Sequence, residues 1–457
     1  MRIALSFGRL GVLGLVVLLA AAQSRADVLL PAMFSDHMVL QADSAVNVWG
    51  WADPQEEVTV AISGQSKSTR AAADGRWMIK LDPLKAGKPG PLSVRGKNAI
   101  TINDVLVGQV WVCSGQSNMA MTVNRAMNFD QESAAAKYPE IRQFKVASGA
   151  ATTAQPECTG SWVVCSPDTV GGFTAAGYFF ARELHTVLDT PVGLINSSVG
   201  GTPIESWIDA STQRADPKLK GFFEARDAAQ KSVDREKLAA GYEKQLENWK
   251  KRAAAAKKAG EAAPRKPRDP NDVANRKGDV GGLFNGMIAP LIPYSIAGAL
   301  WYQGEANSRP EKAPYYQEHL SLLVRDWRKR WGEGDFPVAW VQLPNFTREG
   351  SGWSLVREGM LKALAVPNTG MAITIDVGDP KNIHPTNKQA VGKRLAQWAL
   401  ATVYGKNVVP SGPLPNGSEV RDDKVVVSFK YADGLTSRSG ELTGFEIAGA
   451  DRKWHPA

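Results

Sequence analysis

The pattern of hydrophobic and polar residues changes near residue 106. Between residues 27 and 106, short apolar or alternating stretches such as 46–51 and 58–62 lie between turn-forming clusters, which is typical of antiparallel strands. Beyond residue 106, apolar stretches of strand length alternate with longer helical stretches, and this alternation predicts a mostly parallel sheet with helices on both faces. The predicted strands are residues 105–113, 192–196, 296–301, 338–342 and 371–376, and the predicted helices are residues 175–188, 315–331 and 388–404.

These patterns predict an α/β protein with additional β structure at both ends. Residues 27–106 are expected to form a β-sandwich, and residues 107–404 an α/β domain in which ligands bind at the carboxyl ends of the strands. Residues 216–269 interrupt this domain with exposed, charged helices, either as a passive insertion or as a lid or docking surface. Residues 405–457 return to β character, so either they complete the sandwich or the chain is truncated.

The first 26 residues have the features of a secretory signal peptide. Arg2 and Arg9 precede an apolar run over residues 10–22, and the small-residue pattern that ends at Ala26 predicts cleavage there. The apolar run falls short of the ~20 residues that span a bilayer, although an uncleaved membrane anchor is the alternative. We therefore expect a periplasmic or secreted protein without stable membrane insertion after cleavage.

The charge of the chain is concentrated in the insertion. The formal net charge is +8, of which the predicted signal peptide contributes three arginines, and residues 216–269 carry fifteen Lys/Arg against nine Asp/Glu. The rest of the chain is close to neutral. A nucleic-acid-binding protein needs basic residues on its functional face, so this distribution excludes nucleic acid as the expected partner. Oligomeric state is not encoded in any pattern that we recognise.

Cysteine and histidine patterns give no indication of a metal site. No CxxC or HExxH motif occurs in the 457 residues, and we expect neither a metal nor an organic cofactor. Cys158 and Cys165 are close enough in sequence to form a local disulfide in an oxidising compartment, but spacing alone leaves this open. Cys113 lies in an apolar run and is expected to be a buried thiol.

The sharpest chemical feature is the segment VWVCSGQSNM, residues 110–119. A predicted strand ends near Gly115, Ser117 follows, and a helical stretch begins, so the Ser117 hydroxyl is expected at the carboxyl end of a strand. Backbone N–H groups at a helix N-terminus stabilise an oxyanion, which suits a nucleophile. The segment is not the G-x-S-x-G elbow, because Met119 replaces the second glycine, and a simple helix-capping role for Ser117 is the alternative.

A serine nucleophile needs a base, and His384 is the best-placed histidine. It follows a predicted strand, precedes a predicted helix, and has Asp376 and Asp379 before it, as a base and its orienting acid require. The remaining histidines lie in predicted helices, in the N-terminal β region or in the terminal tail: His37, His185, His319 and His455.

Four sequence blocks in this order resemble the sialate O-acetylesterase family, carbohydrate esterases of the SGNH-hydrolase superfamily. The blocks are CSGQSNM (113–119), NSSVGGTPIESW (196–207), GALWYQGEANS (298–308) and DVGDPKNIHPTNKQAVGKRLA (376–396), with a weaker match at 285–294. The resemblance spans about residues 28–450. It implies a three-layer α/β/α fold of the SGNH type.

The resemblance also implies roles for individual residues. Ser117 corresponds to the nucleophile and His384 to the general base, while the oxyanion hole would take an N–H of Gly200 or Gly201 with the side chains of Gln303 and Asn307.

The orienting acid is where this chain departs from the family pattern. Superfamily members commonly carry Asp three residues before the histidine, where this chain has Lys381, and Asn382 also stands where Asp is common. Asp379 and Asp376 are the remaining candidates, with a Ser–His dyad helped by a backbone carbonyl as the alternative.

Two further residues are candidates for substrate contact. Trp301 offers an aromatic face for a sugar ring, and Glu305 places a carboxylate within an apolar block. Core packing is the alternative for the tryptophan, and a buried, hydrogen-bonded role is the alternative for the glutamate.

Together these features predict a secreted serine esterase that removes O-acetyl groups from carbohydrate. The resemblance points to sialic acid, and acetylated xylan or xyloglucan is the alternative substrate. A non-catalytic carbohydrate-binding protein on the same scaffold is the alternative of another class.

Overall fold

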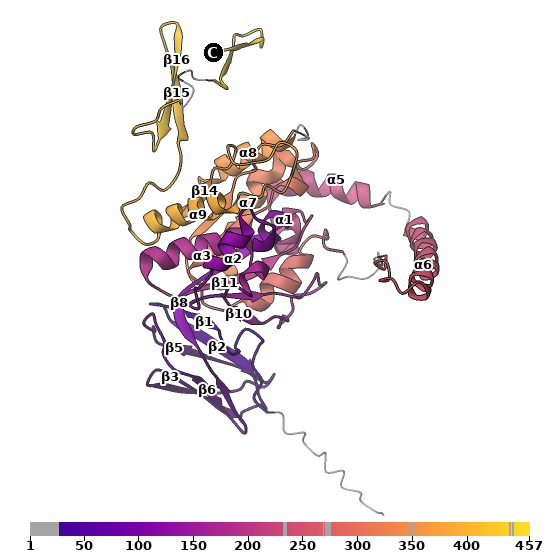
Figure 1. Cartoon of the computed structure of the whole chain (residues 1–457), viewed down its shortest axis with the longest axis vertical. Coiled ribbons are helices and arrows are strands. Elements are labelled where there is room, and N and C mark those ends of the chain that lie inside the picture. The colour runs from indigo at the N-terminus through magenta and orange to yellow at the C-terminus, as the bar shows by residue number, and fades with distance from the viewer. Residues whose placement is uncertain are drawn as a thin grey trace, which may run out of the picture.

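The computed structural model describes residues 27–457 except 232–234, 268, 270–275, 348–349, 351, 438–439 and 441–442. The predicted signal peptide, residues 1–26, therefore lies outside the described residues. The centre of the molecule is a mixed, mostly parallel sheet flanked by helices (Figure 1), which confirms the predicted α/β class.

Strand β8 (Leu106–Gly115) forms the middle of the central sheet, whose strand order is β10-β9-β11-β8-β12-β13-β14. All neighbouring pairs along this path run parallel except β10 and β9. The other strands of this path are β9 (Ile141–Lys145), β10 (Trp162–Val164), β11 (Val192–Ser198), β12 (Gly298–Tyr302), β13 (Val338–Val341) and β14 (Thr369–Ala372).

Helices cover both faces of the sheet. Apolar residues of α3 (Ala175–Leu188) and α9 (Lys388–Thr402) form one buried cluster, and those of α7 (Tyr316–Trp331) and α8 (Gly352–Ala363) belong to another. Successive side chains of β8 point to opposite faces of the sheet and so contribute to both clusters: Trp111 belongs to the first and Val112 to the second. The short helices are α1 (Ser117–Ala120), α2 (Phe129–Ala135) and α4 (Ala210–Ala215).

The N-terminal region forms a pair of small antiparallel sheets. One contains β2 and β5, and the other has the strand order β4-β3-β6-β7. Strand β1 (Val39–Gln41) does not join them: it pairs in parallel with the start of β8 and extends the central sheet. The strands of the small sheets are β2 (Val46–Trp51), β3 (Glu57–Ile62), β4 (Gln65–Arg70), β5 (Arg76–Leu81), β6 (Leu92–Arg95) and β7 (Ala99–Ile102).

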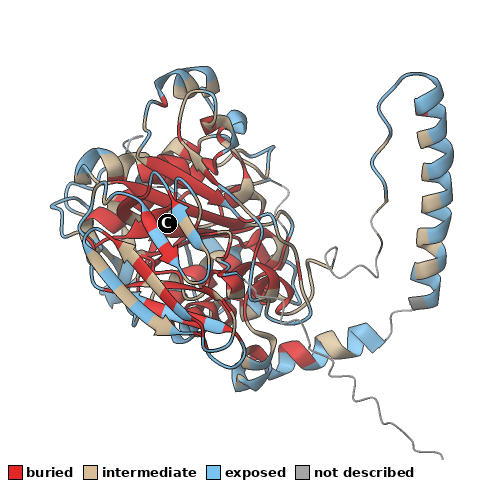
Figure 2. Ribbon diagram, turned by 90° about the horizontal axis from the view of Figure 1, so that it is seen from below, coloured by how far each residue is buried: buried red, intermediate tan, exposed pale blue. Residues whose placement is uncertain are grey.

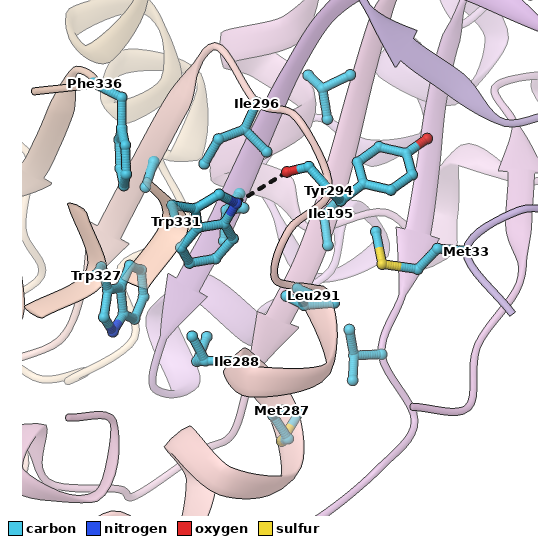
Figure 3. Packing of buried hydrophobic residues seen from close by; sticks show 14 of the residues in the cluster. Met33, Ile195, Met287, Ile288, Leu291, Tyr294, Ile296, Trp327, Trp331 and Phe336 are labelled. Carbon is cyan, nitrogen blue, oxygen red and sulfur yellow. Dashed lines mark hydrogen bonds between the residues drawn. The ribbon is translucent and has the colours of Figure 1, made fainter. Parts of the chain in front are cut away.

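A buried cluster joins the N-terminal region to the central domain. Figure 3 shows Met33 beside the segment that contains Leu291 and Tyr294. The indole N–H of Trp331, at the end of α7, donates to the Tyr294 carbonyl over 2.9 Å. The Tyr294 hydroxyl in turn donates to the carbonyl of Val39 in β1 over 2.8 Å. The two regions therefore share one core.

The charged insertion contains two helices, α5 (Lys220–Lys231) and α6 (Arg235–Lys258). Helix α5 packs part of its surface on the domain through Phe222 and Phe223, whereas α6 stands away from the body of the molecule (Figure 2). Exposed, charged helices were predicted here, and the structure has them.

The C-terminal strands form two hairpins of their own. Strand β15 (Leu414–Arg421) pairs with β16 (Lys424–Lys430), and β17 (Glu446–Ala448) pairs with β18 (Trp454–Pro456). Both pairs are exposed, and the first lies at the opposite end of the molecule from the N-terminal sheets (Figure 1). Within the described residues they do not pair with the N-terminal sheets, so the alternative in which they complete the sandwich does not hold.

Candidate active site

Ser117 lies where the central strand β8 turns into α1. The strand ends at Gly115, which has φ +131°, and the N–H of Gln116 donates to the Tyr302 carbonyl over 2.9 Å. A Cβ atom at Gly115 would lie 2.2 Å from that same carbonyl oxygen, so only glycine fits between β8 and β12. This tight turn brings Ser117 to the carboxyl edge of the sheet, partly exposed.

His384 meets Ser117 across 267 residues of chain. Its Nε2 lies 2.8 Å from the Ser117 Oγ, a hydrogen-bonding distance. The imidazole is carried by the loop between β14 and α9, in which the His384 backbone N–H donates to the Asn382 side-chain oxygen over 3.0 Å. Both Ser117 and His384 are half-buried, so the pair is open to a substrate.

The predicted orienting carboxylates are not at the imidazole. Arg394 binds Asp376 through two hydrogen bonds of 2.6 and 2.7 Å. The side chain of Asp379 accepts from the Lys381 backbone N–H over 2.8 Å. Within the described residues, the His384 ring makes its one hydrogen bond with Ser117, and no carboxylate contacts it. The structure therefore brings together the first two members of the predicted triad and not the third.

The charges that act on the His384 imidazole, among the described residues, belong to cations. Burial, followed by the charges of Lys388 and Arg125, lowers the pKa of the His384 imidazole below its ordinary value of 6.5. The imidazole is consequently neutral at neutral pH and has a lone pair for a proton.

The glycine turn after β11 lies directly against the serine. A Cβ atom built on Gly200 would be 3.4 Å from the Ser117 Cβ, whereas one on Gly201, with φ +71°, would be 3.3 Å from the Lys277 amine. Among the described residues, neither the Ser117 N–H nor the Gly200 N–H has a hydrogen-bond partner. Of the two predicted glycines, Gly200 is the one beside the nucleophile.

Gln303 and Asn307 lie in a buried network below this turn. The Gln303 Nε2 has three acceptors within 3.2 Å: the side-chain oxygens of Asn307 and Gln116 and the Thr202 carbonyl. The Asn307 Nδ2 donates to Glu205 over 2.9 Å, and its oxygen accepts from the Ile204 N–H over 2.9 Å.

Glu205 connects this network to the charged insertion. It is fully buried, and Lys312 donates to it over 2.6 Å while Arg226 of α5 lies 3.6 Å away. Burial alone would raise the pKa of Glu205, but Lys312 and the Asn307 amide outweigh burial and lower it.

Neither predicted substrate-contacting side chain faces solvent. Trp301 is 1% exposed and packs edge-on against Trp207 and Trp327 with ring centroids 6.0 and 6.1 Å apart. Glu305 is 9% exposed, and its Oε1 accepts from the Asn118 amide over 2.6 Å. Trp301 lies on a sheet face that helices cover, whereas Glu305 lies beyond the end of β12 and is bound by Asn118. Both side chains are therefore in the interior, as the alternatives of core packing and of a buried, hydrogen-bonded carboxylate expected.

Two residues beside the site were not singled out by sequence reasoning. Asn118, next to the nucleophile, and Lys388, the first residue of α9, are both fully buried and hydrogen-bonded to each other over 2.6 Å. A signal was available for the lysine, because a cation at the positive end of a helix opposes the helix dipole. In the part of the chain that the structure describes, no group of three or more His, Cys, Asp or Glu is arranged to hold a metal ion.

Comparison with known proteins agrees with this architecture. The model of a family described as carbohydrate esterase, sialic acid-specific acetylesterase, matches residues 107–240 and 283–401. The sialate O-acetylesterase of Mus musculus is 30% identical over 98% of this chain and 88% of that protein, and that of Homo sapiens is 30% identical over 93% and 81%. The crystal structure of a carbohydrate acetylesterase from Xanthomonas citri is similar with a TM-score of 0.78 and 35% identity, covering 94% of this chain and 88% of that one.

These similarities define the class of the protein as a carbohydrate esterase, an enzyme that hydrolyses carboxylic esters. More narrowly, the chain belongs to the family of sialic acid-specific acetylesterases. This membership confirms the resemblance and sets aside the alternative of a non-catalytic binding protein. An acetylated carbohydrate is the substrate class that the family implies.

Proposed function

We propose that the chain removes O-acetyl groups from sialic acid with Ser117 as the nucleophile and His384 as the general base. The observation that carries this proposal is the 2.8 Å contact between Ser117 Oγ and His384 Nε2. The imidazole takes the hydroxyl proton while Oγ attacks the acetyl carbonyl, and the sugar oxygen leaves with that proton. Water activated by the same imidazole then releases acetate and restores the serine.

The developing oxyanion is stabilised by backbone N–H groups at the glycine turn. The N–H groups of Ser117 and Gly200 belong to residues that are close in space at the site and have no other partner among the described residues. Each such donor typically contributes ~3 kcal/mol to the lowering of the barrier. Asn307 is the third donor, because its amide has two hydrogens and uses one of them on Glu205. The amide hydrogens of Gln303 are engaged by three protein acceptors, so they are not available to the oxyanion. Its role is to hold the glycine turn in place.

The mechanism is a Ser–His dyad, because among the described residues no carboxylate contacts the His384 ring. Asp376 is held by Arg394, and Asp379 caps its own turn, which leaves each engaged away from the ring. Orientation of the imidazole then comes from the loop itself, in which Asn382 holds the backbone N–H and Pro385 is buried.

Substitution of the two proposed catalytic residues tests the mechanism. We expect Ser117→Ala and His384→Ala to lower kcat for p-nitrophenyl acetate by at least about a thousandfold, as loss of a nucleophile or its base does. Ser211→Ala, at an exposed serine that bonds Asp209, is the matched control and should retain full activity. Wild-type rates in Ser117→Ala would remove the assignment. Near-normal activity in Asp376→Asn and Asp379→Asn would support the dyad, and a thousandfold loss in either would restore a triad.

An acidic sugar fits the charge at the mouth of the site better than a neutral one. Arg125 is exposed, and its charge acts on His384, which places a guanidinium near the reacting groups. Sialic acid carries a carboxylate, whereas the alternative substrates, acetylated xylan and xyloglucan, have neutral backbones. Acetate release from O-acetylated sialic acid and from acetylated xylan separates the two. A several-fold rise of KM for the sialic acid in Arg125→Gln, with p-nitrophenyl acetate unaffected, is expected.

Export completes the proposed function. The charged start, the apolar run and the small residues before Asp27 support cleavage after Ala26 and a periplasmic or secreted location. No helix among the described residues has the length and apolar character needed to cross a bilayer. Sequencing the N-terminus of protein recovered from the periplasm or medium should give Asp27 as the first residue. Retention of residues 1–26 on membranes would contradict this.

A further inference from the structure

A buried lysine lies behind the Ser117–His384 pair. The side chain of Lys388 is fully buried at the first position of α9, and its amine lies 4.9 Å from the centroid of the Tyr302 ring. Burial removes hydration from the amine, and the N-terminus of a helix is the positive end of its dipole, so folding alone disfavours a cation here. Residues whose charge or burial is unfavourable for folding are concentrated at functional sites.

Asn118 connects this lysine to both reacting groups. Its Oδ1 accepts from the Lys388 amine over 2.6 Å, and its Nδ2 donates to Glu305 over 2.6 Å and to the Ile383 carbonyl over 3.0 Å. An ammonium group only donates hydrogen bonds, so Lys388 fixes which end of the Asn118 amide points towards it. The amide therefore ties the residue after Ser117 to the carbonyl before His384.

The charged groups around His384 and Lys388 come from three neighbouring elements. The charges of Lys388 in α9 and of Arg125 in the short helix Val123–Arg125 act on His384. The charges of Glu305, in the short helix Glu305–Asn307, and of Arg125 act on Lys388. Burial, opposed by Glu305, lowers the pKa of Lys388 to about 7, so the amine is mostly cationic below pH 7, where an imidazole titrates. Arg125 is exposed and screened by water, whereas Lys388 is not.

We propose that Lys388 is a positioning residue of the esterase: its buried charge keeps His384 in the proton-accepting form as the pH falls, and its hydrogen bond holds Asn118 so that Ser117 and His384 stay aligned. In a triad, a carboxylate both orients the histidine and attracts the imidazolium. Lys388 performs only the first of these tasks, through its hydrogen bond to Asn118. The inference rests on the proposed Ser–His function and deepens it.

Replacement of Lys388 by methionine, which is similar in length and uncharged, tests the inference. We expect the acid limb of the kcat/KM profile for p-nitrophenyl acetate to move up by about one pH unit, the effect of one nearby unit charge at an effective dielectric constant of ~20. We expect kcat at pH 8 to fall by roughly tenfold, because methionine cannot donate the hydrogen bond that the lysine amine, cationic or neutral, donates to Asn118. Lys393→Met, at an exposed lysine on the same helix, is the matched control and should shift neither quantity.

A measurement that does not need turnover separates this inference from the proposed function. The titration of the His384 ring is followed by NMR of the folded enzyme, with its signal identified by its loss in His384→Asn. An upward shift in Lys388→Met supports the inference even if Ser117→Ala were to remain active, which would defeat the function alone. An unchanged titration overturns the inference even if activity falls.

A second variant covers the case in which the single substitution does not fold. Lys388→Met combined with Glu305→Gln removes both buried charges and leaves no unpaired ion, so the fold has fewer reasons to fail. The same upward shift of the His384 titration is expected, and its absence in a folded double variant counts against the inference.

Discussion

Replacing Gly115 by alanine tests the turn that delivers the nucleophile. Gly115 ends β8 at φ +131°, where an L-residue is strained, and a Cβ atom there would lie 2.2 Å from the Tyr302 carbonyl oxygen. The next nearest atoms, at 2.7 and 2.9 Å, also belong to the Tyr302 backbone. No side chain can rotate away to relieve the contact, so β8 and β12 must separate.

The size of the effect follows from these distances. An ordinary carbon–oxygen contact is about 3.4 Å, so the two strands must move apart by about 1 Å at the site. Backbone strain of about 1–3 kcal/mol adds to an overpacking cost of about 1–3 kcal/mol, which gives a destabilisation of about 2–6 kcal/mol. That is a large part of the 5–15 kcal/mol that typically holds a domain folded. A displacement of about 1 Å between reacting groups lowers turnover by about a hundredfold.

Urea unfolding followed by tryptophan fluorescence measures the stability, and p-nitrophenyl acetate measures the turnover. Gly64→Ala serves as a control for strain alone, because Gly64 has φ +77° with nothing within 4 Å of an added Cβ atom. Gly172→Ala is the baseline variant. It introduces neither strain nor crowding, because its φ is not positive and its Cβ atom would meet nothing within 4 Å. If Gly115→Ala matched Gly172→Ala in both assays, the reasoning about this turn would be refuted.

Three further predictions concern titrating groups and thiols. Because burial and then Lys388 lower the pKa of His384, we expect the acid limb of kcat/KM below pH 6.5, and a limb at pH 7 or above would contradict this. The pKa of Glu205 is lowered in the fold, so its contribution to stability is complete above about pH 4.5 and is lost as the pH falls further; Glu205→Gln should cost on the order of 3 kcal/mol at pH 7 and less below pH 4.5, and a cost independent of pH in urea unfolding would be inconsistent. Cys158 and Cys165 are buried free thiols, so Ellman's reagent should count three thiols per denatured chain without prior reduction; a count of one would reveal a disulfide.

Local periodicity was enough to predict the helices that flank the sheet. The helix over residues 175–188 has the predicted bounds, and α7 and α9 differ from prediction by one or two residues at their ends. Each has an apolar stripe that the sheet buries, and that stripe is visible in the sequence.

Long-range contacts were not predictable in the same way, and β14 shows the reason. The apolar run favoured a strand over residues 371–376, but the strand ends at Ala372. Beyond it, the Thr374 hydroxyl donates to the Gln342 carbonyl over 2.5 Å, and Arg394 binds Asp376. These partners are eighteen or more residues away, so no local pattern shows that Asp376 is directed away from His384.

The candidate site was predictable as a set of residues and not as a set of contacts. Spacing and resemblance pointed to Ser117 and His384, which the fold brings together, and to Gly200, which lies beside them. The burial of Trp301 could not be predicted, because strand alternation says which face a side chain takes and not whether a helix covers that face. The burial of Glu305, which follows β12 in a short helix, depends on its contact with Asn118, 187 residues away in sequence.

The pairing of β1 with β8 has a consequence for how this enzyme can be rearranged. A shortened chain that starts at residue 107 would remove the partner of the first β8 residues, the Gln41 oxygen that accepts from the Val110 N–H, and the acceptor of the Tyr294 hydroxyl. Residue 106 is consequently not a boundary at which the N-terminal region could be replaced by that of another protein. A functional chimera would have to inherit residues 39–41 together with the catalytic half.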